Sequence, residues 1–328
     1  MALIEIGGRN FLLYLVLPHP LKMALLSESS RTRLDAVNRL FNETAYSGEG
    51  ASNYDQIHRY AEAEQHDHPC RTLVEEVWAP EGYGRALDLG AGSGYFTTMI
   101  ARRATSVKAL EPVPDMQRTL RARCAAEGVS NVEVLGTSVF DLRAHVPDRS
   151  IDSALILQSL HHFHRRPEVF AALGAVVRPG GRLFLVEPHH NARRAVRLLK
   201  AYLADYRAPA FRTNARNWAT HDFLTRREIR ALCRRGGFED VRITGYWIPF
   251  SRRILPDPRR RFRTERLLGV IPGLRHFAAV LAVEARRSGR VVALPHPPSR
   301  SSCPSTTARR GCATRWRASS RRPPATSS

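Results

Sequence analysis

The sequence predicts an α/β fold in which a mostly parallel sheet is covered by helices on both faces. Across residues 85–188, short apolar runs typical of buried strands alternate with segments of helical periodicity. The first of these runs is followed by closely spaced glycines. A Pro-Gly-Gly turn at 179–181 leads into a later apolar run, 182–186. Alternation of this kind favours parallel strands joined by crossover helices.

Residues 85–111 contain a strand, a turn, a helix and a second strand. Arg85–Leu89 is an apolar run, Tyr95–Ala104 has helical spacing, and Val107–Leu110 stops at the acid Glu111. Glycine turns let a ligand lie against bare backbone, and the following helix presents free N–H groups to it. A carboxylate at the end of the second strand can accept two hydrogen bonds from a ribose diol. The unit therefore predicts a nucleotide-type ligand.

The spacing of the glycines separates two ligand classes. A dinucleotide fingerprint, G-x-G-x-x-G, would need a third glycine at position 95 or 97, where the chain has Tyr95 and Thr97. The pattern here is Asp88-x-Gly90-x-Gly92-x-Gly94, which resembles motif I of the class I S-adenosylmethionine-dependent methyltransferases. The alternative is that these glycines form the ordinary glycine-rich first turn that any α/β domain can have.

The resemblance implies a Rossmann-like sheet of seven mostly parallel strands, with an antiparallel last strand and helices on both faces. It implies that S-adenosylmethionine is the cofactor and that Glu111 holds its ribose. The methionine part would be held by the acid and the turn, namely Asp88, Gly90, Ala91, Gly92 and Gly94. Family members often place an acid at position 137 for the adenine, and this chain has Thr137 there. We expect Ser138 or Asp141 to substitute for it.

The resemblance also sets the expected organisation of the chain. Residues 30–287 would form the methyltransferase domain, with a helical cover (30–80), a cofactor core (85–188), a lid insertion (189–222) and a C-terminal half of the sheet (223–287). We expect a capping box at Thr225-x-x-Glu228 to open a helix, a solvated arginine-dense loop at 251–266, and a last strand at 277–284. Residues 1–29 are an extension of uncertain status, in which Met23 offers an alternative start, and 288–328 would be a basic disordered tail. We hypothesise that the tail and the first 22 residues are artefacts of start-site or reading-frame assignment.

Histidines follow the predicted fourth strand at the edge where ligands sit in open α/β sheets. The strand at 151–157 leads into Gln158, a cofactor candidate, and then into His161 and His162. The doublet resembles the Leu-His-His run of small-molecule methyltransferases. Imidazole titrates near neutrality, so either histidine is a candidate general base, with a structural role as the alternative.

Substrate contacts are expected from three regions of the chain. The cover helices and the lid insertion would line the substrate mouth in this family, and the loop after the fifth strand lies at the same edge. A solvated helix face, a simple loop and ordinary core aromatics are the respective alternatives. The candidates are Tyr54, His58, Tyr60, Glu187, His189 and Trp218.

Charge and cysteine content limit the partners, metal sites and cellular location that can be expected. The formal net charge is +21, of which ten arginines in residues 286–328 supply a large part, leaving +11 for the rest. The five cysteines include no C-x-x-C pair, so neither a zinc site nor a disulfide framework is expected, and a reducing, cytoplasmic location is the default. No metal site is predicted. The apolar run at 11–17 is too short to span a bilayer and leaves only a weak surface anchor as an alternative.

The favoured function is S-adenosylmethionine-dependent methyl transfer to a small-molecule acceptor by in-line displacement. The [Asn/Asp]-Pro-Pro-aromatic motif of base N-methyltransferases is absent after the fourth strand, which argues against that reaction. Methylation of RNA or protein stays open because of the basic charge, as does a non-catalytic cofactor-binding protein because of Thr137. Nucleic acid is therefore a less favoured partner than a small molecule, and the sequence sets no oligomeric state.

Overall fold

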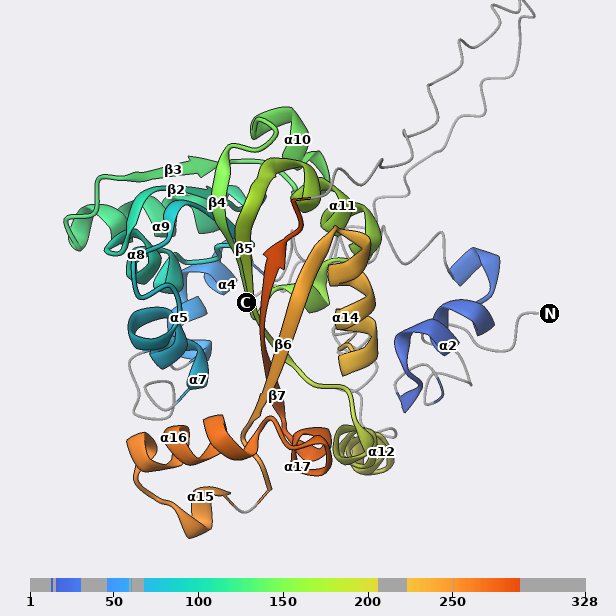
Figure 1. Cartoon of the computed structure of the whole chain (residues 1–328). Helices are drawn as coiled ribbons and strands as arrows, with labels where there is room; N and C mark the ends of the chain where they lie inside the picture. The colour runs from blue at the N-terminus through green and yellow to red at the C-terminus, as the bar shows by residue number, and fades with distance from the viewer. Residues whose placement is uncertain are drawn as a thin grey trace, which may run out of the picture. The chain divides into compact units, whose positions relative to one another are not determined.

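The computed structural model describes residue 13 and residues 16–30, 46–58, 60, 68–205, 223–249 and 251–289. Within them, seven strands form one sheet in the order β3-β2-β1-β4-β5-β7-β6 (Figure 1). All pairings are parallel except those of β7, which runs antiparallel to both β5 and β6. The predicted fold class is thus confirmed. The strands are β1 (Gly84–Leu89), β2 (Ala104–Leu110), β3 (Val132–Leu135), β4 (Ile151–Leu157), β5 (Val177–Pro188), β6 (Phe238–Tyr246) and β7 (Val280–Arg287).

Helices cover both faces of the sheet (Figure 1). One face carries α7 (Pro69–Thr72), the π-helical turn Leu73–Val77, α8 (Tyr95–Ala101) and α9 (Pro114–Ala126). The other carries α10 (Leu142–His145), α11 (Arg166–Val176) and α14 (Arg226–Arg235). The remaining helices are α2 (His19–Leu25), α4 (Glu49–Ser52), α5 (Tyr54–Ile57), α12 (Ala192–Asp205), α15 (Ser251–Ile254), α16 (Pro258–Leu268) and α17 (Pro272–Phe277).

The core lies on both sides of the central strands because successive side chains of a strand point to opposite faces. On β5, Phe184 packs under Trp78 with ring centroids 5.0 Å apart, whereas Leu183 and Leu185 join the opposite cluster with α11. This two-sided burial explains the apolar run at residues 154–157 of β4. The arrangement fixes the carboxyl ends of the parallel strands at one edge of the sheet.

The C-terminal third departs from the prediction at one segment. Residues 251–266 were expected to be a solvated loop, but they form α15 and most of α16. Two local features start α16: Asp257 accepts a hydrogen bond from the backbone N–H of Arg260 at 2.7 Å, and Pro258 occupies the first turn. Phe262 then stacks on Tyr246 of β6 at 5.2 Å, which holds the helix against the sheet.

Other boundaries follow the prediction or shift slightly. The capping box is present, with Thr225 and Glu228 hydrogen-bonded to each other's backbone N–H. The last strand begins at Val280 rather than 277 because Pro272 starts α17 before it. Residues 31–45, 61–67, 206–222 and 290–328 lie outside the described residues, and with them parts of the predicted cover, lid and tail. No helix in the described ranges is long and apolar enough to cross a membrane.

Candidate active site

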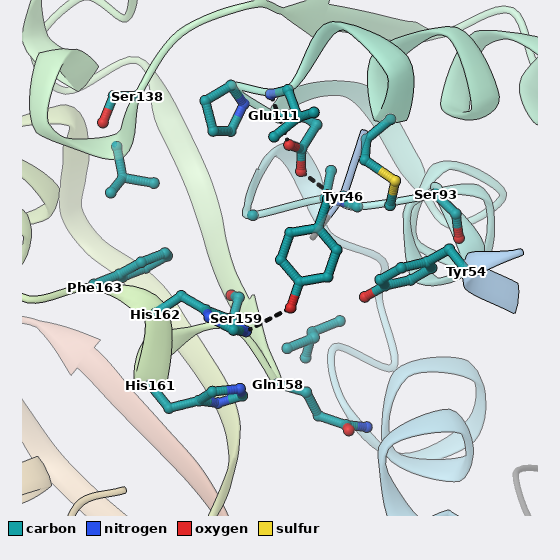
Figure 2. A pocket seen from close by; sticks show the side chains of 18 of the residues that line it. Tyr46, Tyr54, Ser93, Glu111, Ser138, Gln158, Ser159, His161, His162 and Phe163 are labelled. Atoms are coloured by element: carbon teal, nitrogen blue, oxygen red, sulfur yellow. Dashed lines mark hydrogen bonds between the residues drawn. The ribbon is translucent and has the colours of Figure 1, made fainter. Parts of the chain in front are cut away.

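A cavity of about 1110 Å³ opens at the carboxyl edge of the parallel strands (Figure 2). The segments that follow β1 to β5 all contribute to its wall, as does the N-terminal segment 46–60. Most of the wall is apolar or aromatic, with a small number of polar groups at defined places. Arg165 is the one Lys or Arg among the lining residues that the structure describes.

The turn after β1 and the acid after β2 form one end of the cavity. Glu111 accepts hydrogen bonds from the backbone N–H groups of Gly92 and Val113, each at 2.9 Å. Burial raises the pKa of this carboxyl from 4.5 to about 7. Each oxygen uses one lone pair on these bonds and retains another. Glu111 therefore keeps an acceptor on each oxygen at the cavity wall.

Close packing explains why the turn requires glycine at two positions. Gly90 and Gly94 both have positive φ, at 76° and 81°. A Cβ at Gly90 would lie 2.7 Å from the Cβ of Ser159, and one at Gly94 would lie 2.9 Å from the Cγ of Leu120. The hydroxyl of Ser159 in turn donates to the carbonyl of Leu89 at 2.7 Å, which ties the end of β4 to the end of β1.

Asp88 supports the turn from behind. It is buried and accepts a hydrogen bond from the hydroxyl of Thr97 at 2.7 Å, which links β1 to α8. Burial raises the pKa of Asp88 to about 6. Asp88 does not appear in the cavity wall, and neither does Gly94. Both contribute to the shape of the turn.

His161 is held by a fully buried carboxylate. Glu187 at the end of β5 lies 2.5 Å from Nδ1 of His161, and it also accepts the backbone N–H groups of Leu160 and His161 at 3.2 and 3.1 Å. This contact fixes the orientation of the His161 ring at the cavity wall.

Aromatic side chains from the N-terminal segment cover the opposite side of the cavity. Tyr46 lies 3.4 Å from Nε2 of His162 through its hydroxyl, and its ring meets that of Tyr54 edge-on at 5.6 Å (Figure 2). Tyr60 stacks on Tyr95 of α8, with ring centroids 4.2 Å apart and planes 2° apart. Burial raises the pKa of Tyr54 well above its usual value, so this phenol stays neutral.

Two polar contacts hold this cover segment in place. Asp55 accepts the hydroxyl of Ser93 at 2.6 Å and pairs with Arg123 of α9. The backbone N–H of Gly48 donates to Asp115 at 2.6 Å. The cover segment, residues 46–60, is thus attached to the glycine turn and to the start of α9.

The structure brings most of the predicted site residues together. The cavity wall includes both predicted catalytic residues, six of the predicted cofactor residues and three of the predicted substrate residues: His161, His162, Gly90, Ala91, Gly92, Glu111, Ser138, Gln158, Tyr54, His58 and Tyr60. Trp218 lies outside the described residues.

Two substrate candidates, Glu187 and His189, are not among the residues that line the cavity. Glu187 is buried behind His161, as described above, because its carboxylate takes up three protein donors. His189 is also buried, and its Nδ1 lies 3.1 Å from the carbonyl of Ala278. Burial lowers the pKa of His189 to about 4, so it is neutral near pH 7.

Some lining residues were not predicted from the sequence. Tyr46, Met116, Phe163 and Phe223 come from four separate segments, and apolar side chains of this kind are indistinguishable from core residues in a sequence. The partner of Gln158, His68, was also missed: its Nε2 lies 3.2 Å from the Gln158 amide. The contact between Glu187 and His161 was not predicted either; it arises because Leu157 pairs with Val186, which places the ends of β4 and β5 side by side.

The fold and this site define a class of protein. An acid-terminated β2, a glycine turn after β1 and a seven-stranded sheet with one antiparallel strand, β7, are the features of the class I methyltransferase fold. Residues 87–185 match the family described as a methyltransferase domain. The domain that contains residues 87–185 therefore has the fold and the site of the class I S-adenosylmethionine-dependent methyltransferases, a class whose cofactor is S-adenosylmethionine.

Known proteins similar to this chain agree with the assignment. An uncharacterized methyltransferase of Mycobacterium tuberculosis is 38% identical over 110 residues, which are 33% of this chain and 41% of that protein. The chain thus matches about two fifths of that relative's length. A ubiquinone biosynthesis O-methyltransferase of Ralstonia nicotianae is 27% identical over 54% of this chain and 72% of its own.

Among solved structures, a phosphoethanolamine N-methyltransferase 2 of Haemonchus contortus in complex with S-adenosyl-L-methionine has a similar fold. Its TM-score is 0.53 at 14% identity, over 77% of this chain and 60% of that one. At this level of identity the likeness concerns the fold. The same fold carries many acceptor chemistries, so the acceptor must be argued from this chain's own site.

Proposed function

We propose that the chain transfers a methyl group from S-adenosylmethionine to a small-molecule acceptor. The observation that carries this proposal is the single cavity, which joins a ribose-type acceptor, Glu111, to an aromatic and histidine-lined end at His161–Phe163. Its volume of about 1110 Å³ exceeds the upper end of ordinary single-ligand sites, roughly 1,000 Å³. This leaves room for a cofactor and a small acceptor together.

The described residues fit the cofactor at the glycine turn. Glu111 would accept the two ribose hydroxyls with the acceptors that its backbone bonds leave over, and Ala91 and Gly92 would let the ligand lie against backbone. Ser138 lines the wall after β3, where the adenine contacts are expected. When bound, the cofactor supplies a methyl group that its positive sulfur activates for in-line displacement.

His161 is the better placed of the two histidines to act as general base. The buried Glu187 carboxylate lies 2.5 Å from Nδ1 of His161, the arrangement by which a carboxylate orients a catalytic imidazole. A base at this position favours an acceptor that must lose a proton, such as a hydroxyl group. The O-methyltransferase activity in the name of the Ralstonia relative is consistent with this interpretation.

The lining also bears on the alternative of RNA or protein methylation. Nucleic-acid sites depend on several Lys and Arg side chains along the phosphate path. Here none of the arginines of α15 and α16 lines the cavity, and Arg165 is the one cation among its described lining residues.

The buried thiols Cys70, Cys124 and Cys233 are free, which supports the proposed cytoplasmic location.

Methyl-labelled S-adenosylmethionine and a fractionated cell extract provide the test. We expect label to enter the small-molecule fraction, and His161→Gln to lower that incorporation while leaving calorimetric binding of the cofactor unchanged. His162→Gln is the matched control, since His162 shares the wall but not the Glu187 contact. Label confined to RNA or protein would contradict the proposal. Cofactor binding without any transfer would favour a non-catalytic binding protein.

A further inference from the structure

Exposed apolar side chains are concentrated on one part of the chain. Ten of the twelve large apolar residues that are exposed within the described ranges belong to α12, α15, α16 and α17 or the turn between the last two; the other two are Leu13 and Leu21. We call these ten residues the apolar patch: Val196, Leu199, Leu203, Ile254, Leu267, Leu268, Val270, Ile271, Leu274 and Phe277. Exposed apolar residues that gather on neighbouring helices mark an interaction surface more often than single exposed residues do.

The turn between α16 and α17 presents its apolar side chains outward from a fixed backbone. Leu267 and Val270 are 73% and 52% exposed. Between them Gly269 accepts a hydrogen bond from the N–H of Gly245 at 2.9 Å, and a Cβ at Gly269 would lie 2.1 Å from the Gly245 carbonyl. The turn is therefore held tightly against β6, and its apolar side chains are exposed although its backbone is well anchored.

Helix α12 carries a second exposed apolar stripe. Val196, Leu199 and Leu203 are spaced by three and four residues, which places them on one helix face. All three are exposed, whereas Leu198, on a different face, is buried. The helix therefore packs on the protein through the face of Leu198 and exposes the face that carries these three residues.

The helices that carry the apolar patch also carry many exposed cations and little acid to offset them. Between residues 192 and 204 the chain has no Asp or Glu, and between 251 and 277 it has two, Asp257 and Glu265. Glu265 is buried and accepts hydrogen bonds from Trp247, Ile248 and Ser251. Exposed cations on the same helices are Arg193, Arg197, Lys200, Arg252, Arg253, Arg259, Arg260, Arg263 and Arg266.

Topology places these helices at the edge that holds the cavity. α12 follows the carboxyl end of β5, and α15 follows that of β6, which runs parallel to β5 (Figure 1). The start of α12 is joined to α17 through Asn191, whose amide donates to the carbonyl of His276 at 3.0 Å. Arg193 also donates to the carbonyl of Trp247 at 3.2 Å. Pro188, which lines the cavity, lies just before α12.

We propose that the apolar patch and its surrounding arginines dock on the surface of an anionic lipid bilayer. Leucine, valine, isoleucine and phenylalanine side chains enter the boundary between headgroups and acyl chains, while arginines attract anionic headgroups. A second copy of the chain fits less well, because a two-fold interface would place like-charged arginines opposite one another. RNA would engage the arginines and leave the leucines exposed to water. Docking by this face brings the cavity edge of the sheet toward the membrane.

Vesicle sedimentation of the full-length chain tests the proposal. The probes are vesicles of equal parts phosphatidylcholine and phosphatidylglycerol, beside vesicles of phosphatidylcholine alone. We expect binding to the anionic vesicles, and about tenfold or greater weakening by Leu267→Glu combined with Ile271→Glu, since each removes an apolar side chain from the bilayer. Arg259→Gln and Arg263→Gln should each weaken binding about fivefold. Leu21→Glu and Arg143→Gln, at exposed positions elsewhere, should leave binding unchanged.

Vesicle binding at high salt distinguishes docking by this face from attraction by the ten arginines of residues 286–328. Purely electrostatic attraction by that segment is lost at high salt, whereas apolar insertion resists it. Residual high-salt binding that disappears in the Leu267→Glu and Ile271→Glu variant, with an unchanged thermal midpoint, supports the proposal. Equal vesicle binding by that variant and the wild type overturns it. So does a stable dimer that the same variant dissociates, or competition by RNA that eliminates vesicle binding at high salt.

Discussion

The Glu111 carboxyl gives a prediction that needs no knowledge of the acceptor. Its pKa of about 7, raised by burial, means that about half of the chains hold a protonated Glu111 at neutral pH. A protonated carboxyl donates one hydrogen bond and cannot accept from both ribose hydroxyls. Cofactor affinity should therefore rise with pH through 7, by roughly tenfold between pH 6 and pH 8.

Glu111→Gln provides the matching perturbation. The amide keeps the shape of the side chain but replaces one acceptor oxygen with an NH₂ donor. Losing one charge-assisted hydrogen bond of about 1.5–3 kcal/mol should weaken cofactor binding roughly ten- to a hundredfold. The variant should also lose the pH dependence, since its amide does not titrate in this range.

Isothermal titration calorimetry with S-adenosylmethionine at pH 6, 7 and 8 measures both effects. Glu133→Gln is the control, because Glu133 is an exposed acid on the neighbouring strand that pairs with Lys108 and does not line the cavity. The reasoning would be refuted by a Glu111→Gln variant that binds as tightly as the wild type. It would also be refuted if the variant kept the pH profile of the wild type.

Three further predictions concern stability, each measured by chemical denaturation. Burial raises the pKa of Glu111 from 4.5 to about 7. Below pH 4.5 this shift makes the fold about 3 kcal/mol more stable than it is above pH 7, and the gain is lost as the pH rises through 7. The difference in unfolding free energy between wild type and Glu111→Gln should change with pH in the same way. Thr225→Ala should lower the unfolding free energy by about 1 kcal/mol through loss of the capping box, with Thr119→Ala, inside α9, as the control. Gly174→Ala should destabilise by about 1–3 kcal/mol or more, because its Cβ would lie 2.1 Å from the Gly236 carbonyl.

The centre of the sheet could be predicted from sequence because its strands are buried on both faces. β4 begins and ends at the predicted residues, 151–157, and its apolar part, 154–157, is buried throughout. The arginine-dense helix α16 could not, because its few core contacts, such as Phe262 on Tyr246, depend on tertiary packing rather than on composition. Its Arg, Leu and Glu residues have good helix propensity, and the cap at Asp257, Pro258 and the aromatic stack add to it.

The site was predictable where backbone geometry decides and was less so where side chains compete for partners. The glycine turn and Glu111 have positions fixed by the βαβ unit. Glu187 lies at the predicted edge, but its orientation follows from three protein donors that no local pattern indicates. Tyr46 reaches the cavity from a segment far away in sequence, which spacing arguments within residues 85–188 could not detect.

The attachment of the cover segment has a kinetic consequence. Tyr54 lies over the glycine turn, within 3.5 Å of the position of a Cβ on Gly92, so a ligand against that turn is enclosed on that side. For a ligand to leave past the cover segment, three contacts must open. These are the contacts of Asp55 with Ser93 and Arg123, and the bond from Gly48 to Asp115. Release of a ligand from that turn would then be coupled to the opening of the cover segment.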